Sequence, residues 1–169
     1  MSVSATRSRN ALLAVPRALY RALGAAEEVA AMALLVGIVA VVALQVVGRY
    51  LLPNPFIWPE EVTRLMLVWL TFIGGAAVTR HGAHIAVDLV LDLMPDASRR
   101  LMGVLINLVT GAVFVFVALL AAKLAGNVAT LPLAATRWSM AVMVWPAAVG
   151  CGLIALHAFV RAAAGVRRP

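Results

Sequence analysis

The sequence predicts an all-α integral membrane protein with four transmembrane helices. The first observation is composition: of 169 residues, 64% are hydrophobic and 12% are charged, against about 45–50% apolar and about 25% charged in soluble domains. The second is a mean hydropathy of +1.00. The third is that the apolar residues gather in four runs long enough to cross a bilayer core. A single membrane domain, residues 1–169, is therefore expected.

The net charge of +7 is explained by this fold class. Arginines flank the apolar runs, where such residues set topology and contact lipid headgroups. No basic patch is interleaved with aromatic residues, so membrane lipids are expected partners and nucleic acid is not. The single cysteine, Cys151, lies in an apolar run, and no Cys/His zinc spacing is present.

The chain is expected to open with a cytoplasmic or interfacial segment, residues 1–28. Four arginines lie in it, and a short helix at the interface, broken by Pro16, is predicted. Glu27 and Glu28 separate this segment from the apolar run, which argues against a cleaved signal peptide. The first transmembrane helix is predicted over 29–48.

The second span, residues 60–79, begins with a charged group. Glu60 and Glu61 lie where the helix dipole favours negative charge. Arg64 follows four and three residues later, on the same face. One interpretation is a helix-start cap with an intrahelical pair. Charges at membrane depth cost about 2.5–3.5 kcal/mol each, so the alternatives, a contact point for another membrane subunit or an ion or substrate site, stay open.

Between the second and third spans, residues 84–94 predict a short amphipathic helix at the interface. His84 and Asp88 begin a polar stripe with four-residue spacing, and the segment is too short and too charged to span. Two ligand sets remain as alternatives: His81, His84 and Asp88 for a metal ion, or these histidines with His157 for a haem. Neither set is complete, so no metal and no cofactor are expected.

The third span is predicted over 101–122 and the fourth over 138–160, kinked at Pro146 and followed by a cytoplasmic tail, 161–169. Small residues on several helices predict close helix packing. The residues expected to make these contacts are Gly37, Gly74, Gly75, Gly103, Asn107 and Gly111.

Orientation follows from counting basic residues. With both termini inside, the cytoplasmic segments hold ten arginines, whereas the outer segments hold three basic residues, Arg49, Lys123 and Arg137. The positive-inside rule therefore predicts N-in and C-in. Trp58 and Trp138 then both mark the outer interface.

Nothing in the sequence suggests catalysis. No Ser/His/Asp arrangement and no glycine-rich phosphate loop is present, so an enzyme is not expected. The spans offer Gln45, Thr71, Asn107 and Thr110 as internal polar groups, few for the midplane site of a self-sufficient carrier. The pattern favours a scaffold.

Several motifs, in order, carry a resemblance. They are the GRY at Gly48–Tyr50, the run WPEEVTRLMLVWLTFIGGA at Trp58–Ala76 and RHGAHIAVD at Arg80–Asp88. With the four-span layout, they resemble the DctQ-like family, the small membrane subunit of tripartite ATP-independent periplasmic (TRAP) transporters. The resemblance covers roughly residues 28–161.

The resemblance implies a location in the bacterial inner membrane and a role in symport. It implies a large permease subunit as a separate chain, and a periplasmic binding protein that delivers the substrate. Uptake of an organic anion, such as a C4-dicarboxylate, a sialic acid or a similar carboxylate, would be driven by an ion gradient, with sodium the expected ion. Carried over to this sequence, the subunit-interface residues would be Arg49, Trp58, Glu60, Glu61, Arg64, His84 and Asp88. The alternatives are a self-sufficient oligomeric transporter or channel and a b-type haem electron-transfer subunit.

Overall fold

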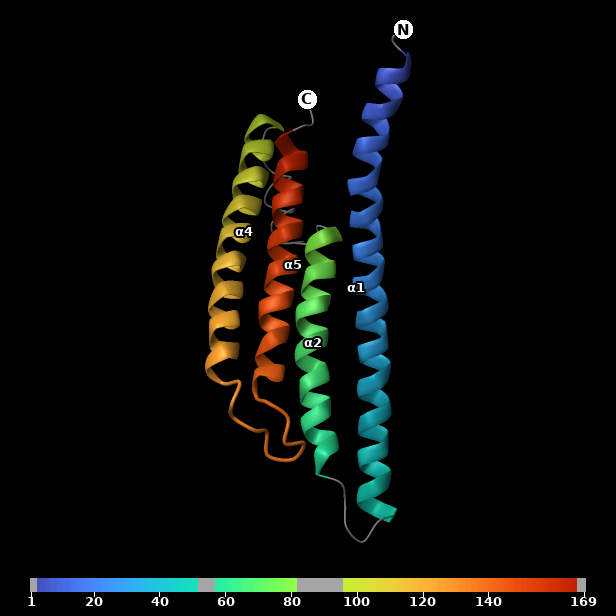
Figure 1. The fold of residues 1–169 in the computed structure, drawn as a ribbon, viewed down its shortest axis with the longest axis vertical. Helices are drawn as coiled ribbons and strands as arrows, with labels where there is room; N and C mark the ends of the chain where they lie inside the picture. Colours follow the sequence, from blue (N-terminus) through green and yellow to red (C-terminus); the bar gives the residue numbers. More distant parts are fainter. Residues whose placement is uncertain (1–2, 52–56, 82–95, 167–169) are drawn as a thin grey trace.

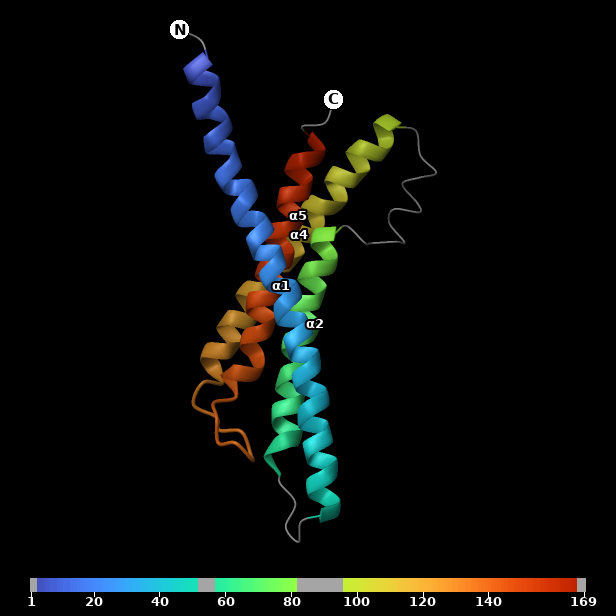
Figure 2. The same ribbon diagram turned by 90° about the vertical axis from the view of Figure 1, so that its right-hand side faces the viewer.

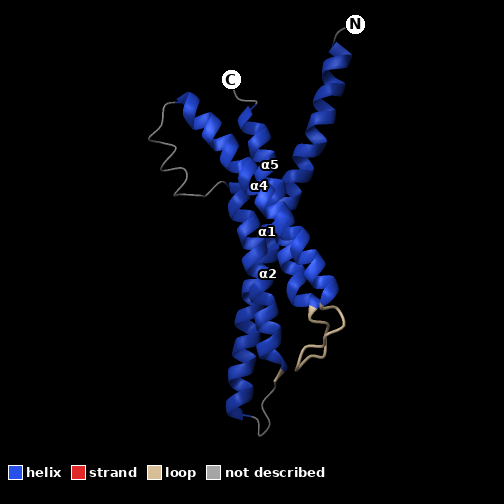
Figure 3. Cartoon of the chain, turned by 90° about the vertical axis from the view of Figure 1, so that its left-hand side faces the viewer, coloured by secondary structure: helices blue, strands red, loops and turns tan. Residues whose placement is uncertain are grey.

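The computed structural model describes residues 3–51, 57–81 and 96–166. They form four long helices: α1 (Val3–Leu51), α2 (Trp58–His81), α4 (Asp96–Asn127) and α5 (Ala141–Val166). Each contains a stretch long and apolar enough to cross a membrane, which confirms the prediction of an all-α, four-span protein (Figure 3). The predicted interfacial helix over 84–94 lies outside the described residues.

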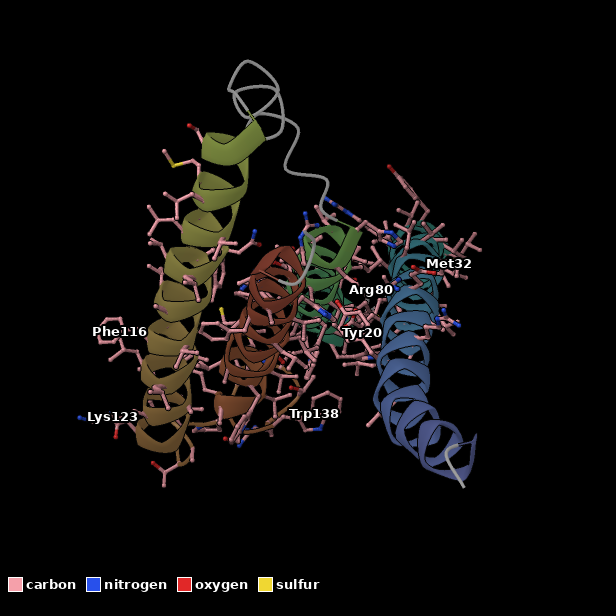
Figure 4. The ribbon with its side chains drawn as sticks, turned by 90° about the horizontal axis from the view of Figure 1, so that it is seen from above. Tyr20, Met32, Arg80, Phe116, Lys123 and Trp138 are labelled. Atoms are coloured by element: carbon pink, nitrogen blue, oxygen red, sulfur yellow. The ribbon has the colours of Figure 1, made fainter. Side chains whose placement is uncertain are left out.

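The four helices stand side by side in one row, in the order α4, α5, α2, α1 (Figures 1 and 4). In the described part of the chain, close backbone contacts join only neighbours in this row. The start of α1 and the end of α5 lie at one end, here called the terminal end, and the end of α1 and the connection from α4 to α5 lie at the other, the loop end (Figure 1). At the terminal end, the first parts of α1 and α4 lean apart (Figure 2).

Local sequence sets several helix ends. Pro59 lies in the first turn of α2, where no backbone N–H is needed. Arg80 and His81 occupy its last turn, where a cation suits the helix dipole. At the start of α5, the backbone N–H of Ala141 donates to Ser139 Oγ over 3.2 Å, as in an N-cap.

The first helix differs most from its prediction. A break at Pro16 was expected, but α1 runs without interruption from Val3 to Leu51, so that prediction is wrong. Alanine, leucine and arginine on both sides are strong helix formers. Because helix extension is cooperative, such neighbours outweigh one unfavourable residue. Helix α4 is also longer than predicted, and ends at Asn127 rather than 122.

Small side chains make the contacts between helices. The most buried apolar residues are alanines with Cys151 and Ile154, and most of them lie on α5, which agrees with its place inside the row. At the contact of α2 and α5, a Cβ on Gly150 would lie 3.1 Å from the backbone Cα and carbonyl carbon of Phe72. The α2 and α5 backbones therefore approach closely here because residue 150 has no side chain.

Candidate functional site

A buried polar bridge joins α1 to α5 near the terminal end. Nε2 of His157 lies 2.8 Å from Oε1 and 3.1 Å from Oε2 of Glu27, and Nδ1 lies 3.1 Å from the Tyr20 hydroxyl. His157 is fully buried and Glu27 is 4% exposed. Because an ionised carboxylate can only accept hydrogen bonds, Nε2 is the donor to Glu27. We call Glu27, His157 and Tyr20 the buried bridge.

Arg80 of α2 extends the buried bridge toward the surface. Its Nε lies 3.9 Å from Oε2 of Glu27, and its Nη2 pairs with Glu28 Oε1. Nε2 of His81 lies 2.9 Å from the same Glu28 oxygen. The Arg80 guanidinium lies directly against Gly24 of α1, where a Cβ would collide with it. Figure 4 shows Arg80 and Tyr20 together beside α1.

A second arginine, Arg161, caps the end of α2 that lies at the terminal end. Nη1 of Arg161 on α5 donates to the carbonyl oxygen of Thr79 over 3.4 Å, and so satisfies one of the last carbonyls of α2. The Thr79 hydroxyl donates to Gly75 O, one turn earlier, over 2.9 Å. Three helices are thus tied together by polar groups at one end of the bundle.

At the loop end, Glu61 holds the connection between α4 and α5. Its Oε2 accepts from the Thr136 N–H over 2.6 Å, and its Oε1 from the Ala135 N–H over 3.4 Å. The connection folds back on itself, since Leu133 N–H donates to Trp138 O over 2.7 Å. Arg137 in between has a φ of 60°, a left-handed conformation that is uncommon for a residue with a side chain.

Glu61→Ala is expected to loosen this connection, because both amides lose a charged acceptor. The amides of Ala135 and Thr136 should exchange with deuterium roughly tenfold faster, as measured by hydrogen-exchange mass spectrometry. Arg64→Ala is the matched control, since it breaks only the exposed pair with Glu60. Unchanged exchange in the Glu61 variant would show that the carboxylate does not hold the connection.

The other predicted interface residues lie on the surface or outside the described chain. Arg64 Nη2 donates to Glu60 Oε1 over 3.0 Å, and both side chains are largely exposed. Arg49 and Trp58 are exposed at the loop end. His84 and Asp88 fall in the segment that the structure does not describe. Trp58, Glu60, Glu61 and Arg64 therefore all lie at the start of α2.

The predicted packing residues have different surroundings. A Cβ on Gly37 would lie 2.6 Å from Met66 Cε of α2, and one on Gly111 would lie 2.7 Å from the Phe159 ring of α5. Gly75 faces Ile154 at 3.5 Å, whereas Gly74 has nothing within 4 Å. Asn107 is half-buried, and its side-chain nitrogen donates to Gly103 O over 2.7 Å, within its own helix.

The residues that sequence reasoning missed are those of the buried bridge. In the sequence, Glu27 argues against a signal peptide and His157 is a candidate haem ligand, and neither pattern predicts that the two residues meet. Both ring nitrogens of His157 are engaged by Glu27 and Tyr20, so in this arrangement neither faces a haem. A usable signal was present: Glu27 stands just before the first predicted span and His157 lies near the cytoplasmic end of the fourth, and each is costly to bury unpaired.

Four apolar spans tied by polar groups at both ends define a multi-pass membrane protein. Residues 38–168 match the family described as tripartite ATP-independent periplasmic transporters, DctQ component. The chain belongs to this family. It is a protein of the bacterial inner membrane, and its family is one of transporter subunits, which are not enzymes.

Similar characterised proteins carry related names. An ectoine TRAP transporter small permease protein of Halomonas elongata is 34% identical over 71 residues, 42% of this chain and 37% of the relative. A sialic acid TRAP transporter small permease protein of Vibrio cholerae is 29% identical over 73 residues, 43% and 42% of the two chains. A sialic acid TRAP transporter permease protein of Haemophilus influenzae is 27% identical over 85 residues, 50% of this chain and 14% of the relative. The matched part thus spans about two fifths or less of these relatives.

Proposed function

We propose that the chain is the small permease subunit of a TRAP-type secondary transporter, a fixed scaffold beside a large permease subunit. A periplasmic binding protein would deliver an organic anion such as a carboxylate, and an ion gradient, with sodium the expected ion, would drive uptake. The observation that carries this proposal is the single row of helices. A row encloses no pathway, so the solute would cross through another chain.

The polar groups within the spans support a scaffold role. The Thr71 hydroxyl donates to Leu67 O over 2.8 Å, and the Asn107 amide is used inside its own helix. Two of the internal polar side chains considered for transport are thus hydrogen-bonded locally. The polar groups that join different helices lie at the ends of the bundle, where they fix helix positions rather than line a route.

The proposal includes an orientation of the chain in the membrane. We place the terminal end in the cytoplasm, as the distribution of arginines favours. The buried bridge then lies at the cytoplasmic side, and Glu61 with the α4–α5 connection at the periplasmic side. Trp138, which is exposed at the loop end, would mark the periplasmic interface.

The proposal is tested by co-expressing the tagged chain with a large TRAP permease subunit from the same organism. We expect the large subunit to co-purify in a stable complex, and uptake in proteoliposomes to require both chains together with the binding protein. The tagged chain alone is the control and is expected to carry nothing. Solute flux through the isolated chain would contradict the proposal and favour a self-sufficient transporter.

A further inference from the structure

A groove of about 470 Å³ runs between α1 and α2. Three residues of each helix line it: Ala30, Ala33, Leu34, Met66, Trp69 and Ile73. Ala30 and Ala33 are small, and they leave the space that larger side chains on α1 would fill. Nearby, Gly37 meets Met66, which brings the two helices together beside the groove.

One residue that lines the groove, Trp69, has a polar group without a hydrogen-bond partner among the described residues. Trp69 is the only lining side chain with a hydrogen-bond donor, and none of the described residues accepts a hydrogen bond from its indole N–H. Trp69 also lies midway along α2, about 17 Å from either end at about 1.5 Å per residue. This depth is unusual, because tryptophans of membrane helices are enriched at the interfaces, where one end of the ring meets water.

The depth of Trp69 decides between occupants of the groove. An unpaired N–H in hydrocarbon is costly. The polar groups of a lipid lie at the edges of a core about 30 Å thick, so an acyl chain at mid-depth offers no acceptor. If a second copy of this chain docked groove against groove about a two-fold axis, Trp69 would meet the same donor on its partner. A helix from a different membrane protein can supply an oxygen at this depth.

We propose that the groove receives a side chain from a transmembrane helix of the large permease subunit, and that this helix offers Trp69 a hydrogen-bond acceptor. This inference rests on the proposed function, and it names the surface through which the chain would bind the large subunit. The acceptor is a hydroxyl or amide oxygen, or a free backbone carbonyl of an interrupted helix. The partner group must complement the partial positive charge of the Trp69 N–H. An acceptor oxygen does so, whereas a cationic side chain would be repelled.

The first test removes the donor and keeps an aromatic ring. Trp69→Phe is expected to weaken association with the large subunit about three- to tenfold, the range of a single hydrogen bond between membrane helices. Association is measured as energy transfer between labelled subunits in vesicles at increasing lipid dilution. Trp145→Phe is the matched control. Trp145 is exposed near the loop end of α5, where water can reach its indole, so no change is expected.

The second test fills and maps the groove. Ala33→Leu adds bulk at an exposed lining position, and association should fall at least tenfold, whereas Ala112→Leu, at an exposed position on α4 at the far edge of the row, should leave it unchanged. A photoreactive amino acid at position 33 should cross-link to the large subunit, and the same group at position 112 should not. Equal monodispersity of all variants shows that folding is intact.

The outcomes separate the two proposals. A wild-type chain that never associates with the large subunit overturns the proposed function together with the groove assignment. A wild-type chain that associates, with Trp69→Phe and Trp145→Phe behaving alike, overturns the groove assignment alone. Cross-links from position 33 to phospholipid only, in an assembled complex, also overturn it, because the groove would then hold an acyl chain.

Discussion

Replacing Glu27 by alanine is expected to destabilise the folded chain by about 3 kcal/mol. The change removes one partner of a buried pair and leaves His157, which is fully buried, with a ring N–H that has lost its acceptor. It also removes the carboxylate 3.9 Å from Arg80 Nε. The loss should appear as a decrease of roughly 5–10 °C in Tm, measured by circular dichroism in detergent.

Two comparisons make this prediction specific to the buried bridge. Glu60→Ala removes a carboxylate whose side chain is 71% exposed, and its effect should stay within experimental scatter, as for most surface ion pairs. In a double-mutant cycle, Glu27→Ala with His157→Ala should cost clearly less than the sum of the two single changes, because the first already breaks their contact. Equal losses for Glu27→Ala and Glu60→Ala would show that the bridge contributes no stability.

Gly150→Leu is expected to cost more than about 3 kcal/mol, at the upper end of overpacking changes. The new Cβ would meet the Phe72 backbone at 3.1 Å. Since backbone cannot move aside as a side chain can, α2 and α5 would have to separate. Unfolding by a denaturing detergent, followed by loss of helical signal, gives the measurement.

Gly152 provides the matched control on the same helix. A Cβ at this position has nothing within 4 Å, so Gly152→Leu should be neutral, or slightly stabilising because leucine favours helix more than glycine does. If both leucine variants unfold alike, then helix propensity and not the α2–α5 contact governs the effect at Gly150.

The spans were predictable because hydropathy along the sequence measures burial in lipid directly. The helix ends were less predictable. Helix α1 begins at Val3, far ahead of its apolar run, and hydropathy gives no signal for a helical extension outside such a run. The prediction for α2 differs from the structure by only two residues at each end, because Pro59, Glu60 and Arg80 mark its ends chemically.

The candidate site was less predictable than the spans. Sequence spacing reveals partners within one helix, such as Glu60 with Arg64, which the structure shows. It does not show that Glu61 meets a connection 75 residues further on, or that Glu27 meets His157 across 130 residues. Depth in the membrane can be read from the sequence, but the rotation of each helix about its axis cannot.

The row of helices has a thermodynamic consequence for assembly. Four helices about 10 Å wide expose a perimeter of about 100 Å in a row and about 80 Å in a compact square. Met32 on α1 and Phe116 on α4 point outward from the two edges of the row (Figure 4). A flat neighbour docking along one long face would release the ordered annular lipids from about 40 Å of that perimeter. The entropy of the released lipids would then favour a complex even where direct contacts are few.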